Sequence, residues 1–585
     1  MSSELDIRNY IEFAKELTLK AGEIFKCGFE GEKIVETKDH EWDLVTDYDK
    51  KIENVLINGL KTKFPDHEFI GEESHVKETP VLTDKPTWII DPIDGTMNYV
   101  NSLPFTCISI GLAVCKELAA GIIYNPLTAE LYTAIKGQGA FLNDKPISTT
   151  TVTELKKALI EIELFSLRIP SRNRDIRTGR LDALIHASRG VRVIGSAALS
   201  LAYVAKGALD SFHMDFLQPW DVAAGVLIVR EAGGSVLDTK EEQYNFMKPN
   251  TIAAGNCTLA TEIKELIINT DLKTMPNTVS LDVFSRGRTR VHYLPGNCER
   301  VREIEMARYT EDVYYEFAIK LTHDAAQILK TAISGKKNVD EKLGDWDLVT
   351  EYDRKIESIV IGQLKAKFSD HRFIGEESTG SELPELTDDP TWIIDPIDGT
   401  TNFVHGFPHT CVVIGLAIKK EMVIGIVYNP VLEQLFTARK GRGAFLNNKP
   451  IRVSNIQDLS KALVCLESGF IKIDHMREKT IERLRTIVQK AQGIRTLGVA
   501  ALSLCYIAMG IVEAYYIEGP GISTWDIAAA SLIITEAGGV VVDRVTGEKI
   551  DIMKPRAIGA CNEKIAKEMV KLIREADEKV KEGNK

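Results

Sequence analysis

The sequence lacks the features that mark several classes of protein. Its 9 cysteines include no CxxC pair, so we expect neither a zinc cluster nor a disulfide framework, and reduced thiols in the cytosol are the simplest interpretation. The net charge of -12 disfavours a nucleic-acid partner. The first residues show no basic segment followed by an apolar one, so we expect no signal peptide.

Long apolar runs are also scarce. The longest uncharged run, residues 496–512, is near the lower length limit for a membrane span. Its small and polar residues, together with a partial copy at residues 193–205, favour a buried helix. We therefore expect no membrane partner.

What the sequence does contain is a long internal repeat. WDLVTDYDKKIE at Trp42 returns as WDLVTEYDRKIE at Trp346, and TWIIDPIDGT, FIGEES and GAFLN are each present twice in the same order. So long a period is typical of duplicated domains, and 585 residues exceed one ordinary core. We predict domains at residues 1–268 and 308–585, joined by a basic linker at residues 269–307.

Helix and strand signals alternate within each unit. Apolar residues recur at helical spacing over residues 7–24 and again over residues 52–64. The segments CISIGLAV and AAGIIYNP, like their copies, are rich in Ile and Val and predict strands, with Asn-Pro turns after the second. Helices mixed with meandering strands predict a layered mixed α/β (α+β) domain.

Acidic residues follow the ends of hydrophobic segments. Glu72 follows a predicted strand that ends at Ile70, and Asp91 and Asp94 follow one that ends at Ile90. Loops at such positions collect functional groups. Because carboxylates held close together repel, a cation is their natural partner, and oxygen ligands without nearby His or Cys favour Mg²⁺ over zinc or copper.

The DPIDGT segment adds an argument for phosphate. Gly95 lets the backbone approach a ligand closely, and Thr96 supplies a hydroxyl and a backbone N–H. A helix starting there would point free N–H groups at an anion. Taken alone, each element also has a structural explanation, such as Asp221 acting as a helix N-cap. Their repeated combination favours a site.

These motifs resemble the inositol monophosphatase family of lithium-sensitive, Mg²⁺-dependent phosphatases. The resemblance rests on GEES, WIIDPIDGT followed by Asn two residues later, a Trp-Asp pair before small residues, and EAGG, all present in both units. It implies two tandem α/β/α/β/α sandwich domains and two to three Mg²⁺ ions in each. It also implies hydrolysis of inositol monophosphate, a small-molecule phosphate ester, by metal-activated water.

The resemblance assigns roles to individual residues. The metal ligands would be Glu72, Asp91, Ile93, Asp94 and Asp221 in the first unit, and Glu376, Asp395, Ile397, Asp398 and Asp526 in the second. The catalytic pairs that orient the attacking water would be Thr96 with Asp49, and Thr400 with Asp353. The substrate-binding residues would be Gly95, Thr96, Ala197, Gly399, Thr400, Ala500 and Glu518. Lysines that support the metal-bound waters would be Lys38 and Lys342.

The two units differ near the predicted substrate. The glutamate that the family places before Trp-Asp corresponds to Glu518 in the second unit and to Met214 in the first. We therefore predict that the second unit is the better inositol monophosphatase. Two alternatives stay open: a related sugar-phosphate or bisphosphate-nucleotide phosphatase, or one active domain beside a regulatory or structural copy. We expect either an internal pseudo-dimer of the two units or a homodimer of the chain.

Overall fold

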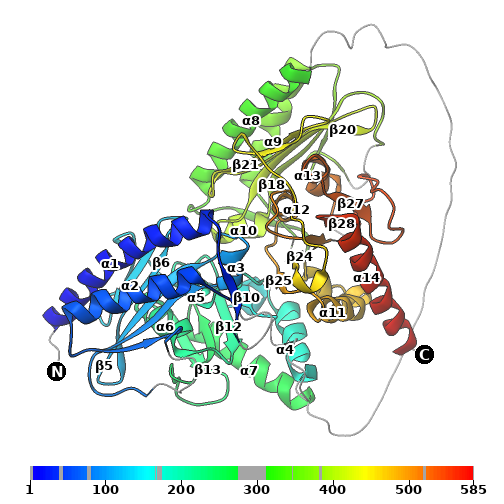
Figure 1. Cartoon of the computed structure of the whole chain (residues 1–585). Helices are drawn as coiled ribbons and strands as arrows, with labels where there is room; N and C mark the ends of the chain where they lie inside the picture. Colours follow the sequence, from blue (N-terminus) through cyan, green and yellow to red (C-terminus); the bar gives the residue numbers. More distant parts are fainter. Residues whose placement is uncertain are drawn as a thin grey trace.

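The computed structural model describes residues 4–38, 44–74, 81–164, 167, 174–274, 311–344, 347–380, 385–517 and 522–583. These residues form two units of the same architecture (Figure 1). Of the predicted linker, residues 269–274 belong to the last helix of the first unit, and residues 275–307 lie outside the described residues. We therefore propose that the first unit extends to Thr274.

The first unit comprises, in chain order, α1 (Glu4–Glu30), β1 (Val35–Thr37), β2 (Leu44–Thr46), α2 (Asp47–Lys63), β3 (Glu68–Gly71), β4 (Thr87–Asp94), α3 (Thr96–Val100), β5 (Cys107–Val114), β6 (Glu117–Asn125), β7 (Glu130–Ile135), β8 (Ala140–Leu142), β9 (Lys145–Pro146), η1 (Leu155–Lys157), β10 (Leu159–Ile162), α4 (Arg174–Ala187), β11 (Gly190–Arg192), α5 (Ala197–Ala205), β12 (Ser211–Asp215), α6 (Pro219–Glu231), β13 (Ser235–Asp238), β14 (Asn250–Ala254) and α7 (Cys257–Thr274).

The second unit repeats this order with α8 (Glu311–Ala332), β15 (Val339–Gly344), β16 (Asp347–Thr350), α9 (Glu351–Lys367), β17 (Arg372–Gly375), β18 (Thr391–Asp398), α10 (Thr400–His405), β19 (Cys411–Ile418), β20 (Glu421–Asn429), β21 (Gln434–Arg439), β22 (Ala444–Leu446), β23 (Lys449–Pro450), η4 (Leu459–Lys461), β24 (Leu463–Leu466), η5 (Gly469–Lys472), α11 (Asp474–Val488), β25 (Gly493–Arg495), α12 (Ala500–Ala508), β26 (Ala514–Tyr516), α13 (Thr524–Glu536), β27 (Val540–Asp543), β28 (Ala557–Ala560) and α14 (Glu563–Gly583).

A seven-stranded sheet with the order β3-β4-β5-β6-β7-β8-β9 forms one half of the first unit. Strands β3 and β4 are parallel, and the later neighbours are antiparallel. Alternate side chains of β4 face opposite layers, as strand geometry requires. Trp88 and Ile90 join the apolar cluster that includes α1 and α2, whereas Ile89 joins the cluster that includes α6. The sheet is therefore covered on both faces.

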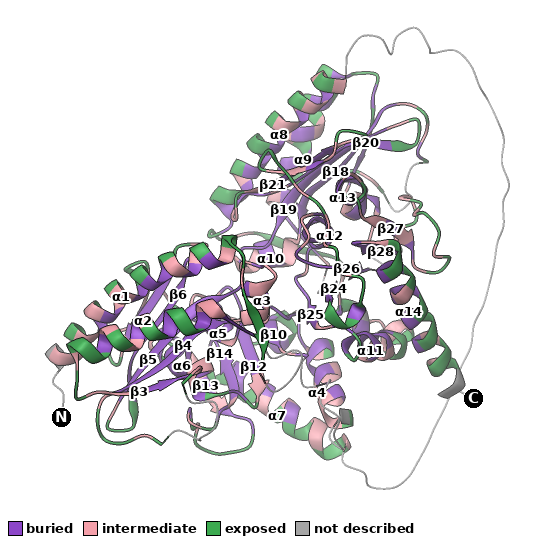
Figure 2. Ribbon diagram, in the orientation of Figure 1, coloured by how far each residue is buried: buried purple, intermediate pink, exposed green. Residues whose placement is uncertain are grey.

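A second sheet, with the order β11-β10-β12-β14-β13, forms the other half. Helices α5 and α6 lie between the two sheets, and α4 and α7 cover the outer face of the smaller sheet. The central strands β4, β5 and β6 are buried along nearly their whole length, while the outer helices expose one side to solvent (Figure 2). The α/β/α/β/α order implied by the family resemblance is confirmed in both units.

The central helix layer is buried and built from small residues. In α6, Val222, Ala223 and Ala224 are fully buried, and a side chain at Gly121 of β6 would meet Ala224 O at 2.6 Å. The predicted buried helix within residues 496–512 is α12, all of whose residues are buried. Among the described helices, none combines the length and the apolar character that crossing a bilayer requires.

The two units pack against each other near α3 and α10 (Figure 1). Val193 and Thr496 form an antiparallel bridge, and the rings of Phe105 and Phe407 stack with their centroids 5.9 Å apart. Buried residues of both units belong to one continuous apolar cluster. Each unit therefore helps to bury the core of the other.

Candidate metal and phosphate site

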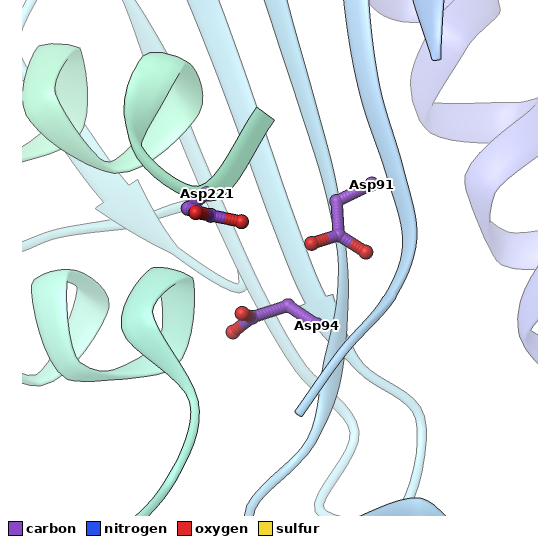
Figure 3. A group of neighbouring side chains, drawn as sticks. All are labelled: Asp91, Asp94 and Asp221. Carbon is purple, nitrogen blue, oxygen red and sulfur yellow. The ribbon is translucent and has the colours of Figure 1, made fainter. Parts of the chain in front are cut away.

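Three aspartates of the first unit converge on one small space (Figure 3). Asp91 and Asp94 come from β4, and Asp221 comes from the first turn of α6. Each offers a carboxylate oxygen, and these oxygens all lie within 4.8 Å of one another. The second unit repeats the group with Asp395, Asp398 and Asp526. All six are metal ligands predicted from the sequence.

A bulge in β4 brings Asp91 and Asp94 together. The pairing with β5 shifts register between these two residues and resumes where Asp94 faces Cys107. Within the bulge, Ile93 N–H donates to Asp91 Oδ1 at 3.0 Å. Side chains three positions apart on a regular strand point to opposite faces, and a bulge re-aims one of them. The prediction that the strand ends at Ile90 was wrong, because this renewed pairing extends β4 through Asp94.

The start of α6 orients the third aspartate. Asp221 is the N3 residue of a capping box, in which Gln218 N–H donates to Asp221 Oδ2 at 2.6 Å. Ser523 N–H and Asp526 Oδ2 form the same contact at 2.6 Å. The alternative that Asp221 is itself the N-cap is wrong, because the N-cap is Gln218. One carboxylate oxygen holds the helix end, which fixes the direction of the other.

The turn before α5 holds Asp94. Ala198 N–H donates to Asp94 Oδ2 at 3.0 Å, and the Ser196 hydroxyl donates to the same oxygen. In the second unit Ala501 N–H donates to Asp398 Oδ2 at 2.7 Å. The GSAA turn (residues 195–198) and the GVAA turn (residues 498–501), which contain the predicted substrate-binding residues Ala197 and Ala500, therefore also position a carboxylate.

Glu72 lies beside the aspartates and is held by a lysine. Its N–H donates to Ile90 O at 3.1 Å at the end of β3. Lys38 Nζ donates to Glu72 Oε1 at 2.7 Å and to Glu73 Oε1 at 2.6 Å. Glu53, a buried acid of α2 that sequence analysis did not select, accepts from Glu73 N–H at 2.9 Å. In the sequence, Glu53 could have been recognised only because the second repeat has an acid, Glu357, at the matching position.

The second unit reproduces these contacts. Lys342 Nζ lies 2.7 Å from Glu376 Oε1, and Glu377 N–H donates to Glu357 at 2.7 Å. Both predicted lysines therefore lie against the first glutamate of GEES. This placement fits a role in organising the charged site.

Burial opposes ionisation of the acidic group. Burial and then the nearby charges of Glu72 and Asp94 raise the pKa of Asp91 well above its usual range. Burial also raises the pKa of Asp94 and of Asp221. Like charges held together in a buried site cannot all ionise without compensation. Lys38 contributes one positive charge, so a further cation is needed to balance the fully ionised group.

The donor set fits a divalent metal ion of the magnesium type. The clustered ligands are carboxylate oxygens from three aspartates in each unit. The carbonyl of Ile93, also a predicted ligand, lies in the same bulge and accepts from Thr96 Oγ1 at 3.1 Å. Hard oxygen donors of this kind suit Mg²⁺ or a similar ion better than zinc or copper.

The predicted Thr-Asp pair is present in both units. Thr96 Oγ1 lies 3.4 Å from Asp49 Oδ1, and Thr400 Oγ1 lies 3.2 Å from Asp353 Oδ1. The other oxygen of Asp49 accepts from Thr46 N–H at 2.7 Å as part of the α2 capping box. Asp49 is therefore both a capping residue of α2 and a neighbour of the Thr96 hydroxyl. Burial raises the pKa of Asp49 to about 7 and that of Asp353 to about 6.

Glycine is required immediately before Thr96 and Thr400. Gly95 and Gly399 have φ of 82° and 86° and precede the short helices α3 and α10. A side chain at Gly95 would also meet the carbonyl oxygen of Gly195 at 3.0 Å. Only glycine adopts this backbone conformation freely, so the turn that presents the threonine depends on it.

A cavity adjoins each acidic group. The cavity of the first unit has a volume of about 250 Å³, and its lining includes Asp94, Asp221 and Ala197. The cavity of the second unit, about 220 Å³, brings together most of the residues predicted there, namely Glu376, Asp395, Ile397, Asp398, Gly399, Thr400, Ala500 and Asp526. Residues drawn from four distant segments therefore share one cavity.

The predicted substrate glutamate, Glu518, lies outside the described residues. The register of β10 with β12 pairs Ile162 with His213, and that of β24 with β26 pairs Leu466 with Tyr516. The next residues, Met214 and Ile517, are therefore equivalent, and each lines its cavity. The predicted correspondence of Met214 with Glu518 was wrong by one residue, because this strand register makes Met214 the counterpart of Ile517. An apolar side chain occupies this position in both units.

Two arginines, which no sequence motif had marked, reach across the unit boundary. The glycines of the GSAA and GVAA turns, Gly195 and Gly498, lie against Arg495 and Arg192 of the opposite unit. A side chain on Gly195 would meet Arg495 Cζ at 2.4 Å, and one on Gly498 would meet Arg192 Cζ at 2.3 Å. Each arginine lines the cavity of the other unit. In the sequence, the two arginines could have been found because they occupy matching positions in the two repeats.

Comparison with known proteins identifies the family of the chain. The sequence model described as "Inositol monophosphatase family" matches residues 6–272 and again residues 310–578. The chain belongs to the inositol monophosphatase family. The family and the tandem duplication expected from the motifs are thereby confirmed. Inositol monophosphatases are phosphatases, so the chain falls among the hydrolases.

Relatives match about half of the chain. Inositol monophosphatase 1 of Bos taurus is 42% identical over 267 residues, which are 44% of this chain and 93% of the relative. Inositol monophosphatase 2 of Solanum lycopersicum is 43% identical over 267 residues, with 45% and 99% covered. Among solved structures, the Thermotoga maritima IMPase is 32% identical, covers 46% of this chain and 99% of its own, and superposes with a TM-score of 0.41.

Proposed function

We propose that the chain hydrolyses inositol monophosphates to inositol and phosphate at two Mg²⁺-dependent sites, one in each unit. The observation that carries the proposal is the convergence of Asp395, Asp398 and Asp526 on one cavity with the glycine turn and Thr400. The first unit contains the same acidic group. Complete groups in both units favour two active sites over one site and an inactive copy.

The acidic groups would bind two to three Mg²⁺ ions in each unit and present a phosphate to the start of α3 or α10. In the first unit Asp91, Asp94, Asp221 and Glu72 would be the side-chain ligands, with the carbonyl of Ile93. When bound, such ions polarise a phosphoryl group and acidify a water molecule. The capping contacts of Asp221 and the turn contacts of Asp94 orient these carboxylates before any ion binds.

The Thr-Asp pair would orient the attacking water. The Thr96 hydroxyl donates to Ile93 O or to Asp49, which leaves its lone pairs free to accept from water. Thr46 holds the other oxygen of Asp49, so the carboxylate cannot turn away. Because burial raises the pKa of Asp49 to about 7, this carboxylate is suited to accept a proton near neutral pH.

The cellular setting is also part of the proposal. The described cysteines are free thiols, which supports a reducing compartment such as the cytoplasm. The contacts between the units support a chain that works as an internal pseudo-dimer. Light scattering tests this, because a pseudo-dimer has the 65.0 kDa mass of one chain. Lithium sensitivity is proposed from the family resemblance, and assays with lithium chloride test it.

The deciding experiment measures phosphate release from inositol monophosphate by Asp91→Asn, Asp395→Asn and the double variant. We expect each single variant to retain activity from its intact site and the double variant to lose at least about 10³-fold. Excess chelator should abolish release by the unmodified chain. Undiminished release by the double variant, or in chelator, would refute the proposal. Higher activity in Asp395→Asn than in Asp91→Asn would reverse the predicted ranking of the units.

A further inference from the structure

Each substrate cavity is closed by a segment of the opposite unit. The end of α11 and strand β25 bring Gln492 and Ile494 to the cavity of the first unit. The equivalent segment after α4 brings Arg189 and Val191 to the cavity of the second. The two segments occupy equivalent places, because Arg189 precedes Gly190 of β11 and Gln492 precedes Gly493 of β25. At this one position the first cavity therefore receives a neutral amide and the second a guanidinium.

At two further pairs of equivalent positions, the first cavity again has the less polar residue. The residue after Thr96 is Met97, whereas the residue after Thr400 is Thr401. Met97 lines the first cavity, and Thr401 lines the second. The residue two positions after β10 is Leu164 in the first cavity, and its counterpart after β24 is Ser468 in the second. All three exchanges make the first cavity more apolar and the second more polar.

At one pair of equivalent positions the first cavity has the more polar residue, and the contacts of that residue explain why. Ser196 of the first cavity corresponds to Val499 of the second. The Ser196 hydroxyl donates to Asp94, so its polarity serves the metal site and not the substrate. The position of Met214 and Ile517 is apolar in both cavities. The difference in polarity therefore rests on Met97, Leu164 and Gln492 and their counterparts.

Arg189 is placed to recognise an anion. Its side chain is 12% exposed, and its Nη2 lies 4.0 Å from Glu341 Oε1 of the second unit, whose side chain is 56% exposed. A planar guanidinium can bind a phosphate or a carboxylate through two parallel hydrogen bonds, which an amide cannot match.

We propose, as a consequence of the phosphatase function above, that the two sites act on different phosphate esters. The second-unit site selects esters that carry a second anionic group, a phosphate or a carboxylate, and Arg189 of the first unit determines this specificity. The first-unit site selects esters whose body is uncharged and partly apolar. The chain is then one polypeptide with two complementary substrate ranges.

The proposed difference in specificity follows from the cost of desolvating the second anionic group of the ester. Arg495 and Arg192 line the two cavities alike and donate to Asn98 and Asn402, so they do not distinguish the sites. In the first cavity an added anion would lie near Met97 and Leu164, where Gln492 supplies no charge, and burying a charge without a partner is costly. In the second cavity Arg189 offsets that penalty. An apolar ester body gains more from contact with Met97 and Leu164 than with Thr401 and Ser468, because burial of apolar surface is favourable.

The test uses the full chain with one site inactivated at a time. Asp91→Asn leaves the second-unit site, and Asp395→Asn leaves the first. Each is assayed with Mg²⁺ on fructose bisphosphate, phosphoglycerate, glycerol phosphate and phenyl phosphate. We expect the ratio of kcat/KM for fructose bisphosphate or phosphoglycerate to kcat/KM for glycerol phosphate to be about tenfold higher at the second-unit site. We expect the ratio of phenyl phosphate to glycerol phosphate to favour the first.

Exchange variants test the residue itself. In the Asp91→Asn chain, Arg189→Gln should lower kcat/KM for fructose bisphosphate and phosphoglycerate about tenfold more than for glycerol phosphate. In the Asp395→Asn chain, Gln492→Arg should raise the same ratio, which supplies a matched control in the opposite direction. An effect on fructose bisphosphate alone would identify the second group as phosphate, and an effect shared with phosphoglycerate would extend it to carboxylates.

The outcomes separate this inference from the proposed function. If neither single-site chain hydrolyses any ester, the phosphatase proposal fails. If both hydrolyse the panel with equal ratios, or if Arg189→Gln lowers kcat/KM for every ester by the same factor, the phosphatase proposal stands and the division of substrates is overturned. If the Arg189→Gln chain does not fold, the kcat/KM ratios of the two single-site chains and the effect of Gln492→Arg still test the division of substrates.

Discussion

Arg495 of the second unit donates to Asn98 Oδ1 of the first, through Nε at 2.8 Å and Nη2 at 2.6 Å. Asn98 lies on α3, two residues after Thr96, and its Nδ2 donates to the carbonyls of Phe105 and Ile194 at 2.6 and 2.7 Å. The reciprocal pair, Arg192 Nε and Asn402 Oδ1, is 2.9 Å apart. The helix that follows each predicted phosphate turn is therefore held by the opposite unit.

Arg495→Ala should impair the first-unit site more than the second, although the arginine belongs to the second unit. The change leaves Asn98 Oδ1 buried without its donor, which costs about 1–3 kcal/mol and loosens α3. In the Asp395→Asn chain we expect kcat to fall roughly tenfold or more, with a smaller fall in the Asp91→Asn chain. Steady-state assays with the folded fraction measured by circular dichroism check this. Arg495→Lys keeps the charge but loses the paired N–H donors of the guanidinium, so it should restore kcat only in part. Equal losses of kcat at both sites would contradict the positioning role.

Mg²⁺ should stabilise the chain, and increasingly so at higher pH. A carboxyl group whose pKa is raised in the folded state, as burial raises that of Asp91 and Asp395, binds its proton more tightly folded than unfolded. In chelator the unfolding free energy should therefore fall as pH rises from about 5 to about 8, and bound Mg²⁺ should restore it. Thermal unfolding with and without Mg²⁺ measures the effect. A double Asp91→Asn, Asp395→Asn variant should lose most of the Mg²⁺ shift; retention of the full shift would place the ions elsewhere.

Glu231 of the EAGG motif should contribute to stability and not to catalysis. Its carboxylate accepts from the N–H groups of Gly137 and Gly139 at 2.8 and 2.9 Å, and so clamps the turn between β7 and β8. Glu231→Ala should lower the unfolding free energy by about 1–2 kcal/mol, with kcat/KM unchanged at both sites. Denaturant titration and the inositol monophosphate assay check both parts. Glu536→Ala, which removes the equivalent clamp, is the matched control, and a selective loss of activity in either variant would contradict the assignment.

His409 should make the chain less stable in mild acid. Burial and the charge of Arg192 lower the pKa of His409 from 6.5 to about 3, so the unfolded state binds an extra proton as pH falls below the ordinary histidine value. This residue should then reduce the unfolding free energy by up to about 1.4 kcal/mol per pH unit in that range. Phe105 occupies the equivalent place in the first unit, so His409→Phe should flatten the dependence. Chemical denaturation between about pH 4.5 and pH 7 measures it, and an unchanged slope would contradict the prediction.

The sequence alone determined the features that depend on short stretches of chain. Richness in Ile and Val predicted β5 and β6, because β-branched side chains favour strands. Helical spacing predicted α1, because side-chain direction in a helix follows from local geometry. The repeat predicted two similar units, and the motifs indicated Asp91, Asp94 and Asp221 as metal ligands. Oxygen donors without His or Cys already pointed to a hard cation.

Tertiary structure decided how these residues meet and what completes them. Asp91 and Asp94 share a face only because β4 bulges against β5, and Asp221 joins them only because α6 packs between the two sheets. Arg189 reaches the second cavity, and Arg495 reaches Asn98, only because the units dock. Contacts of this kind join segments far apart in the chain, so their geometry depends on the packing of whole layers, which no local pattern of residues encodes.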